Sequence, residues 1–312
     1  MSENRMAATT DLTSGVPEAA FAGSAVRRHM QQKAAFGLLW LAGAIAVGAL
    51  LVVVGYVVIQ GAKVVNLEFL TTPPIGGLEA EGGISTTIVS TIYLVALTIA
   101  IAAPLGVAAA VYLVEYAEEA EGGGSWQARL VGIARFGVET LAGVPSIIFG
   151  LFGYALFVTA MRFGFSLLSA ALAGSCLILP VIIRTTEEAL LAVPRSYREG
   201  SLALGTTQWQ TVSGVVLPAA LPGIITGIIL SIGRVISETA VFFVTFGGSH
   251  RIPTSLRSPG RTMALHVYYV AMETRAYVKA MGTAAVLVAA TVIINATVNY
   301  LSRRLMRELR GV

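Results

Sequence analysis

Long uncharged stretches alternate with short polar segments along most of this chain. A helix that crosses a bilayer needs about 20 consecutive apolar residues. Six stretches have this length with no more than two charged residues each, and we place them at residues 34–62, 82–114, 133–161, 164–183, 219–246 and 280–302. The pattern therefore predicts an all-α polytopic membrane protein with six transmembrane helices.

The segments at the two ends and between the last two spans differ from these runs. Residues 1–33 are rich in Ala, Thr, Ser and Gly, and we expect a disordered tail there. The run that follows is much longer than the roughly 7–15-residue core of a cleaved signal peptide. Residues 247–279 form a polar loop with a short amphipathic helix expected at 263–278, and residues 306–312 form a second tail. Residues 34–305 are thus expected to form one transmembrane domain.

Composition supports the membrane class and excludes several others. Only 12% of the residues are charged, against about 25% in soluble proteins. The single cysteine, Cys176, excludes an intrachain disulfide, and the three histidines lack the spacing of metal ligands. The chain has no Gly-X4-Gly-Lys-Ser/Thr loop for nucleotide phosphates. We therefore expect a non-catalytic membrane subunit with no metal or cofactor of its own, and the net charge of +4 requires no nucleic-acid partner.

The distribution of positive charge predicts the orientation. Six spans place both termini and the polar segment 190–218 on the same side. That side holds thirteen Lys and Arg residues and the opposite side seven, five of them in the loop 247–279. Because cytoplasmic loops carry an excess of Lys and Arg, we expect cytoplasmic termini. The basic loop 247–279 is then external, where it would attract anions or dock an acidic protein surface.

The polar segment 190–218, called here the coupling loop, is longer than a simple turn requires. It contains an amphipathic piece from Arg195 to Leu204, followed by Gly205 and a polar Thr-Thr-Gln-Trp-Gln run. This pattern resembles the EAA loop of ABC importer permeases. In that family a Glu-Ala-Ala is followed by a Gly six positions after the Glu, and then by Ile-X-Leu-Pro. The matching residues here are Glu199, Gly205, Val215, Leu217 and Pro218, while Gly200 and Ser201 replace the alanines.

The resemblance implies a short cytoplasmic helix that docks on an ATPase subunit. Gly205 would turn the chain with positive φ, and Pro218 suits the start of the next helix. The residues expected to couple the chain to the ATPase are Arg195, Tyr197, Arg198, Glu199, Gly200, Ser201, Leu202, Gly205, Leu217 and Pro218.

Further stretches resemble the A-type permease subunits (PstA family) of bacterial phosphate-uptake ABC importers. They are Gly143–Gly153, Ile178–Ala189 and Glu238-Thr239-Ala240, with Val241 where the family often has Pro. The resemblance covers roughly residues 35 to 305 and implies a type I ABC importer permease (MetI-like) fold in the bacterial cytoplasmic membrane. It also implies partners: a PstC-like second permease, a dimer of PstB-like ATPase subunits that bind the ATP, and a PstS-like phosphate-binding protein.

A charged pair deep in the fifth predicted span is the main candidate for the translocation path. Arg234 lies fifteen residues into that span, and Glu238 follows four residues later on the same helix face. An arginine within a bilayer costs at least about 2.5–3.5 kcal/mol, so a role in transport competes with a purely structural one. Arg184, at the end of the fourth span, is a second candidate for contact with phosphate. The acidic run that begins at Glu115 is expected to be a solvated loop rather than a metal site.

Three alternatives remain open at the level of the sequence. A permease for phosphonate, sulfate or molybdate would carry the same arginine pair. An ion-coupled secondary transporter would leave the EAA-like pattern unexplained, and such proteins often show internal repeats, which we do not find here. A membrane-embedded enzyme would require paired carboxylates or a histidine cluster within a span, and neither is present.

Overall fold

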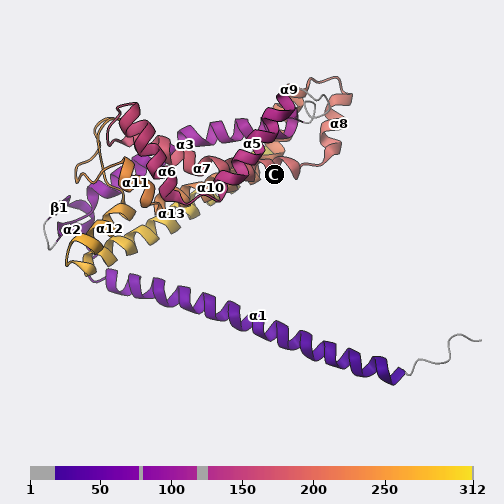
Figure 1. The fold of residues 1–312 in the computed structure, drawn as a ribbon, viewed down its shortest axis with the longest axis horizontal. Helices are drawn as coiled ribbons and strands as arrows, with labels where there is room; N and C mark the ends of the chain where they lie inside the picture. The colour runs from indigo at the N-terminus through magenta and orange to yellow at the C-terminus, as the bar shows by residue number, and fades with distance from the viewer. Residues whose placement is uncertain (1–17, 77–79, 118–125, 311–312) are drawn as a thin grey trace, which may run out of the picture. The chain divides into compact units, whose positions relative to one another are not determined.

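The computed structural model describes residues 18–76, 80–117 and 126–310, and these are mainly helical (Figure 1). The first half comprises helices α1 (Glu18–Gly61), α2 (Leu67–Thr71) and α3 (Ser85–Val111), strands β1 (Pro74–Gly76) and β2 (Glu81–Gly82), the π-helical turn η1 (Tyr112–Tyr116) and α5 (Trp126–Ala142). The second half comprises α6 (Ser146–Gly153), η2 (Tyr154–Ala160), α7 (Leu167–Leu191), α8 (Arg195–Ala203), α9 (Gln208–Thr211), η3 (Val212–Val216), α10 (Leu217–Ser237), α11 (Ala240–Thr245), α12 (Met263–Glu273) and α13 (Tyr277–Arg310).

Five continuous helices are long and apolar enough to cross a bilayer in the described part of the chain. They are His29–Gly61, Ser85–Tyr116, Leu167–Leu191, Gln208–Ser237 and Tyr277–Tyr300. A sixth candidate is a bent pair, Ala128–Ala142 with Ser146–Ala160, whose axes differ by 112°. The predicted count of six spans therefore holds if this bent pair counts as one span.

The third predicted span, 133–161, is thus wrong as a single straight helix. The break falls at Gly143-Val144-Pro145, where Pro145 has an extended ψ of 138° and stands at the start of α6. A proline has no backbone N–H to donate, and it disfavours helical geometry at the residue before it. These two effects end α5 and allow α6 to begin in a new direction.

Two other predicted boundaries also differ from the structure. The predicted disordered tail 1–33 is helical from Glu18 onward, because residues 18–33 are rich in Ala, Gln, Arg and Lys, which are good helix formers. Residues 1–17 lie outside the described part. The fifth predicted span, 219–246, is interrupted: α10 ends at Ser237 and α11 begins at Ala240. The amphipathic helix expected at 263–278 is present as α12.

Helix α7 is the centre of the core formed by residues 57–310. It packs against both α3 and α10, and its apolar side chains Leu177, Ile178 and Ile182 are buried. The contact with α10 depends on Gly227, because a Cβ there would lie 2.0 Å from the Thr185 hydroxyl oxygen. Small residues allow membrane helices to approach closely in this way.

The two ends of this bundle carry different structures. Helices α8 and α9 lie at one end, and β1, α2 and α12 lie at the other (Figure 1). The two-stranded antiparallel hairpin pairs Pro74 with Gly82. The coupling loop and the loop that contains α12 are therefore on opposite ends of the core, as the six-span prediction requires.

Candidate functional site: the coupling loop and the charged pairs

The coupling loop folds into the short helix that its sequence predicts. Helix α8 spans Arg195–Ala203, follows Pro194 and has no buried residue. Its apolar side chains Tyr197 and Leu202 are exposed by 53% and 48%. Gly205 has a φ of +84°, which confirms the left-handed turn expected at this position. The apolar side of α8 is therefore open to a partner.

A second helical run begins directly after this turn. Thr207 and Gln210 form a capping box, in which each side chain accepts a hydrogen bond from the other residue's backbone N–H. The helix then continues from Gln208 through η3 into α10. Pro218 is the second residue of α10, as expected for a proline at a helix start, although the helical run through η3 has begun at Gln208. The Thr-X-X-Gln pattern is the sequence signal that could have located the true start.

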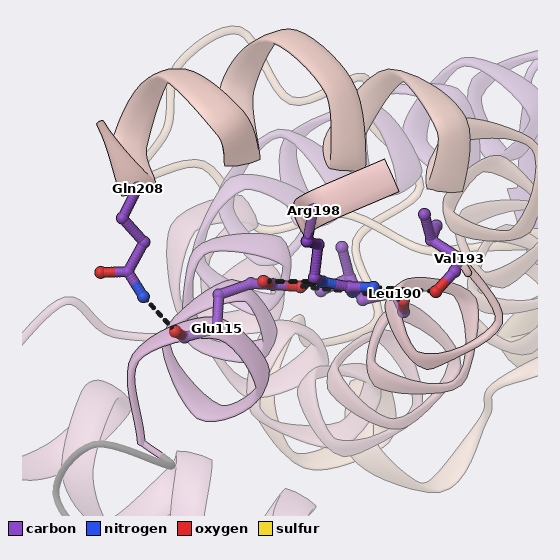
Figure 2. A network of polar contacts seen from close by, with 5 residues as sticks. All are labelled: Glu115, Leu190, Val193, Arg198 and Gln208. Carbon is purple, nitrogen blue, oxygen red and sulfur yellow. Dashed lines mark hydrogen bonds and ion pairs between the residues drawn. The ribbon is translucent and has the colours of Figure 1, made fainter. Parts of the chain in front are cut away.

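Arg198 joins the coupling loop to two transmembrane helices (Figure 2). Its Nη2 lies 2.7 Å from Glu115 Oε1, and its Nε lies 3.1–3.2 Å from the two Glu115 carboxylate oxygens. Nη1 donates to the Val193 carbonyl oxygen at 2.8 Å, and Nη2 donates to the Leu190 carbonyl oxygen at 2.9 Å. The guanidinium therefore connects α8 with η1 and with the carboxyl end of α7.

Arg198 was expected to couple the chain to the ATPase, and its donors are used within the chain, so its coupling role stays a prediction. The network corrects one other prediction. Glu115 was expected in a solvated loop, but its side chain is only 8% exposed and is ion-paired. The other acidic residues of that run, Glu118, Glu119 and Glu121, lie outside the described residues. Arg198 and Glu115 are separated by 83 positions, so no local sequence pattern predicts this ion pair.

Further polar contacts hold the loop in place. The Gln208 side chain donates to the Glu115 backbone oxygen at 2.7 Å. The hydroxyl groups of Ser201, Thr206 and Thr211 lie 2.8–3.0 Å from one another. Ser201, one of the residues predicted to couple the chain to the ATPase, contributes its hydroxyl to this internal cluster. The hydroxyl cluster thus ties α8 to α9, and Arg198 ties α8 to η1 and α7.

Arg234 and Glu238 form the charged pair that their spacing suggests, although not within one helix. Arg234 Nη2 lies 3.9 Å from Glu238 Oε2. Glu238 is in an extended conformation just after α10, and its Oε1 accepts hydrogen bonds from the backbone N–H groups of Ala240 and Val241. Glu238 is 7% exposed, whereas the Arg234 side chain is 52% exposed in this chain. The carboxylate is thus fixed by α11, and the guanidinium is held loosely and remains available.

The third candidate, Arg184, belongs to a separate charged cluster. It pairs with Glu188 at 3.8 Å on an exposed face of α7. Together with Arg135, Glu139 and Glu187, these residues line a cavity of about 420 Å³. The structure therefore does not bring Arg184 into contact with Arg234. Among the described residues, no group of three or more His, Cys, Asp or Glu side chains is arranged to bind a metal ion.

Comparison with known proteins identifies the family. Residues 123–311 match the family described as "Binding-protein-dependent transport system inner membrane component". The chain belongs to this family of permeases. The matched residues include the coupling loop and the broken helix pair, so the multi-pass helical core of this permease is a family feature.

The curated relatives of the permease cover most of its length. A probable ABC transporter permease protein, YqgI of Bacillus subtilis, is 32% identical over 91% of this chain and 99% of its own. PstA 1 of Mycobacterium tuberculosis, a phosphate transport system permease protein, is 36% identical over 73% of this chain and 72% of its own. The phosphate transport system permease protein PstA of Yersinia pestis is 34% identical over 76% of this chain and 75% of its own. The PstA-type resemblance drawn from the motifs is therefore confirmed.

Solved structures identify the fold of the permease. A chain of a bacterial alginate ABC transporter aligns with a TM-score of 0.60 at 13% identity, over 86% of this chain and 96% of that chain. A chain of the MetNI methionine ABC transporter aligns with a TM-score of 0.51 at 22% identity, over 73% and 94%. At such identities the likeness concerns the fold alone, and it confirms the type I ABC importer permease (MetI-like) fold.

Proposed function

We propose that this permease is the transmembrane subunit of an ATP-driven ABC importer of inorganic phosphate. The observation that carries the proposal is the agreement between the EAA-like spacing and the geometry of the coupling loop. The residues at that spacing form an exposed helix that ends at a left-handed glycine. Relatives named as phosphate transport system permeases indicate the substrate. A different oxyanion is the main alternative substrate, because a guanidinium recognises any oxyanion by the same kind of hydrogen bonds.

The proposed complex contains partners that supply energy and substrate. Two ATPase subunits bind ATP, and α8 docks in a surface groove of an ATPase subunit. Tyr197 and Leu202 supply the apolar contacts of this docking. Arg195 and Glu199 supply the charged contacts, and the ATPase packs over Gly200. A second permease completes the pathway, and an external binding protein delivers phosphate. In this arrangement both termini are cytoplasmic, and this chain is itself non-catalytic and carries no cofactor. ATP-driven closure of the ATPase dimer displaces α8 and alternates the access of the pathway.

The internal contacts of Arg198 suggest how that displacement is transmitted. Because Arg198 bonds to Glu115 and to the carbonyl oxygens of Leu190 and Val193, a shift of α8 moves the ends of η1 and α7 with it. Helix α7 in turn packs on α3 and α10, and α10 carries Arg234. The route from the coupling loop to Arg234 thus runs through packed helices.

Phosphate uptake by whole cells tests the proposed substrate. Cells that lack other phosphate importers and produce the complete transporter should accumulate radiolabelled phosphate in an energy-dependent manner. Arsenate, which has the same charge and shape, should compete at excess, whereas sulfate, molybdate and methylphosphonate should not. Equal competition by sulfate or molybdate, or no ATPase subunit purified with the permease, would contradict the proposal.

Arg234→Gln should lower phosphate uptake by about tenfold or more if the guanidinium contacts the ion in transit, because charge-assisted hydrogen bonds to an oxyanion would be lost. Glu238 should remain in place, since it is bonded to the backbone of α11. Arg251→Gln, which removes an exposed arginine, is the matched control. Normal uptake by Arg234→Gln at normal membrane level would assign the pair a structural role only.

A further inference from the structure

A polar cavity lies at the end of the bundle opposite the coupling loop. Its volume is about 280 Å³, and it is bounded by the β1–β2 hairpin, α12 and the loop before α12. Its polar lining consists mainly of Arg261, His250, His266, Tyr269, Glu81 and Glu273. Of the three arginines early in the loop 247–279, Arg251 and Arg257 are exposed and Arg261 is buried. The basic loop is therefore not a uniform charged surface, because one of its arginines faces a cavity.

Arg261 is a buried cation that forms no ion pair within 4.0 Å among the described residues, and the Glu273 carboxylate of the same cavity is the acidic group that acts on it. Arg261 is only 8% exposed. Its guanidinium carbon lies 4.2 Å from the centre of the Tyr269 ring, and its Nη1 lies 3.4 Å from His266 Nδ1. Its Nε is buried and has no hydrogen-bond partner in the described structure. The ring contact satisfies only part of the charge, and an unmatched buried charge is costly.

The neighbouring histidines do not supply further positive charge at neutral pH. Burial, together with the nearby Arg261 and His250, lowers the pKa of His266 to about 3. Burial and Arg261 also lower the pKa of His250. Both imidazoles are therefore neutral at pH 7, so each can accept or donate a hydrogen bond. The cavity combines one strong cationic donor with neutral groups that adapt to a ligand.

The carboxylates restrict the ligand further. Glu81 and Glu273 line the same cavity and are exposed, so they are hydrated and accept hydrogen bonds. An oxyanion that carries a hydroxyl group can accept from Arg261 and donate to a carboxylate or an imidazole. Inorganic phosphate carries such a hydroxyl at neutral pH, whereas sulfate is fully ionised and meets the carboxylates only as a like charge. Lys279, which donates to the Ala80 carbonyl oxygen at 3.0 Å, adds a positive charge beside the cavity.

We propose that this cavity is a binding site for a small hydroxyl-bearing oxyanion of the phosphate class, with Arg261 as its anchor. The inference rests on the proposed function and adds a binding site that is separate from Arg234. On the proposed topology the cavity lies on the external side, so it would receive the ion before the ion enters the membrane. It would also distinguish phosphate from sulfate within the permease itself.

Equilibrium dialysis of radiolabelled phosphate against the purified transporter, without its binding protein, tests the proposal directly. Arg261→Gln should weaken phosphate binding about tenfold or more, since the charge-assisted contacts are lost. Arg251→Gln is the matched control and should bind as the wild type does. Unchanged binding by a correctly assembled Arg261→Gln transporter would overturn the proposal, whereas failure of the proposed function would appear in the uptake assay as transport of a different anion.

A second measurement does not depend on the stability of Arg261→Gln. Thr274→Cys, in a chain with Cys176→Ala, places a thiol on the cavity wall, and Met272→Cys places one on an exposed position of α12 outside it. Phosphate should slow the reaction of a polar thiol reagent with Thr274→Cys and leave Met272→Cys unaffected. Sulfate at equal ionic strength should protect neither. Absence of protection by phosphate, or equal protection by sulfate, would refute the site as described.

Discussion

Glu115→Gln is expected to abolish phosphate uptake while the permease still inserts into the membrane. The substitution removes the carboxylate that accepts three hydrogen bonds from the Arg198 guanidinium. Removal of one partner from a buried ion pair costs about 3–5 kcal/mol, because the other charge stays uncompensated. The pair here is part-buried, with Arg198 20% and Glu115 8% exposed, so we expect the lower part of that range. We expect α8 to lose its fixed position, and ATP hydrolysis to continue without transport.

The control for this prediction is Arg195→Gln, which removes the same kind of side chain from an exposed position of the same helix. It should leave the thermal midpoint of the purified permease nearly unchanged, because exposed charges contribute little to stability. Arg198→Lys should be intermediate, since an ammonium can satisfy the carboxylate but not both carbonyl oxygens as well. Uptake at the wild-type rate by Glu115→Gln would show that this ion pair does not transmit the movement of α8.

Gly205→Val should reduce phosphate uptake by more than about tenfold. Gly205 has a φ of +84°, and a methyl group at this position would meet no atom of the chain within 4 Å. The cost is therefore conformational rather than steric: about 1–2 kcal/mol for an ordinary residue in left-handed geometry, and more for a β-branched one. The backbone relieves this strain by opening the turn, which changes the angle between α8 and the helix that begins at Gln208. Membrane level and uptake measured together report the effect.

Gly200→Ala is the matched control for the glycine turn. A Cβ at Gly200 also meets no atom within 4 Å, but its φ lies outside the left-handed region. Alanine favours a helix over glycine by roughly 1 kcal/mol, so α8 should gain stability and uptake should persist. Wild-type uptake by Gly205→Val would remove the main support for the coupling role of this turn. Loss of uptake in Gly200→Ala would instead indicate that the ATPase packs over position 200 too closely to admit a methyl group.

Local chemistry was sufficient to predict much of the coupling loop and the spans. The run of uncharged residues identifies α3, α7 and α13 because a bilayer imposes both length and composition. Gly205 was predicted to turn with positive φ because only glycine adopts that conformation at low cost. The exposed apolar side chains of α8 follow from a short amphipathic helix between two spans. Each of these features depends on residues close together in the chain.

The partners of the charged side chains were decided by helix packing. Arg198 binds Glu115 across 83 positions, and this pair forms only because α7 and α3 lie side by side and bring their ends to α8. The 112° bend at Pro145 and the break at Glu238 divide two predicted spans, since uniform hydropathy does not reveal where a helix changes direction. The sequence does not separate Arg261 from the other arginines of the basic loop. Its burial beside the hairpin and α12 is decided by the tertiary structure. Hydropathy therefore determines which segments enter the membrane, and packing between distant helices determines which charges meet.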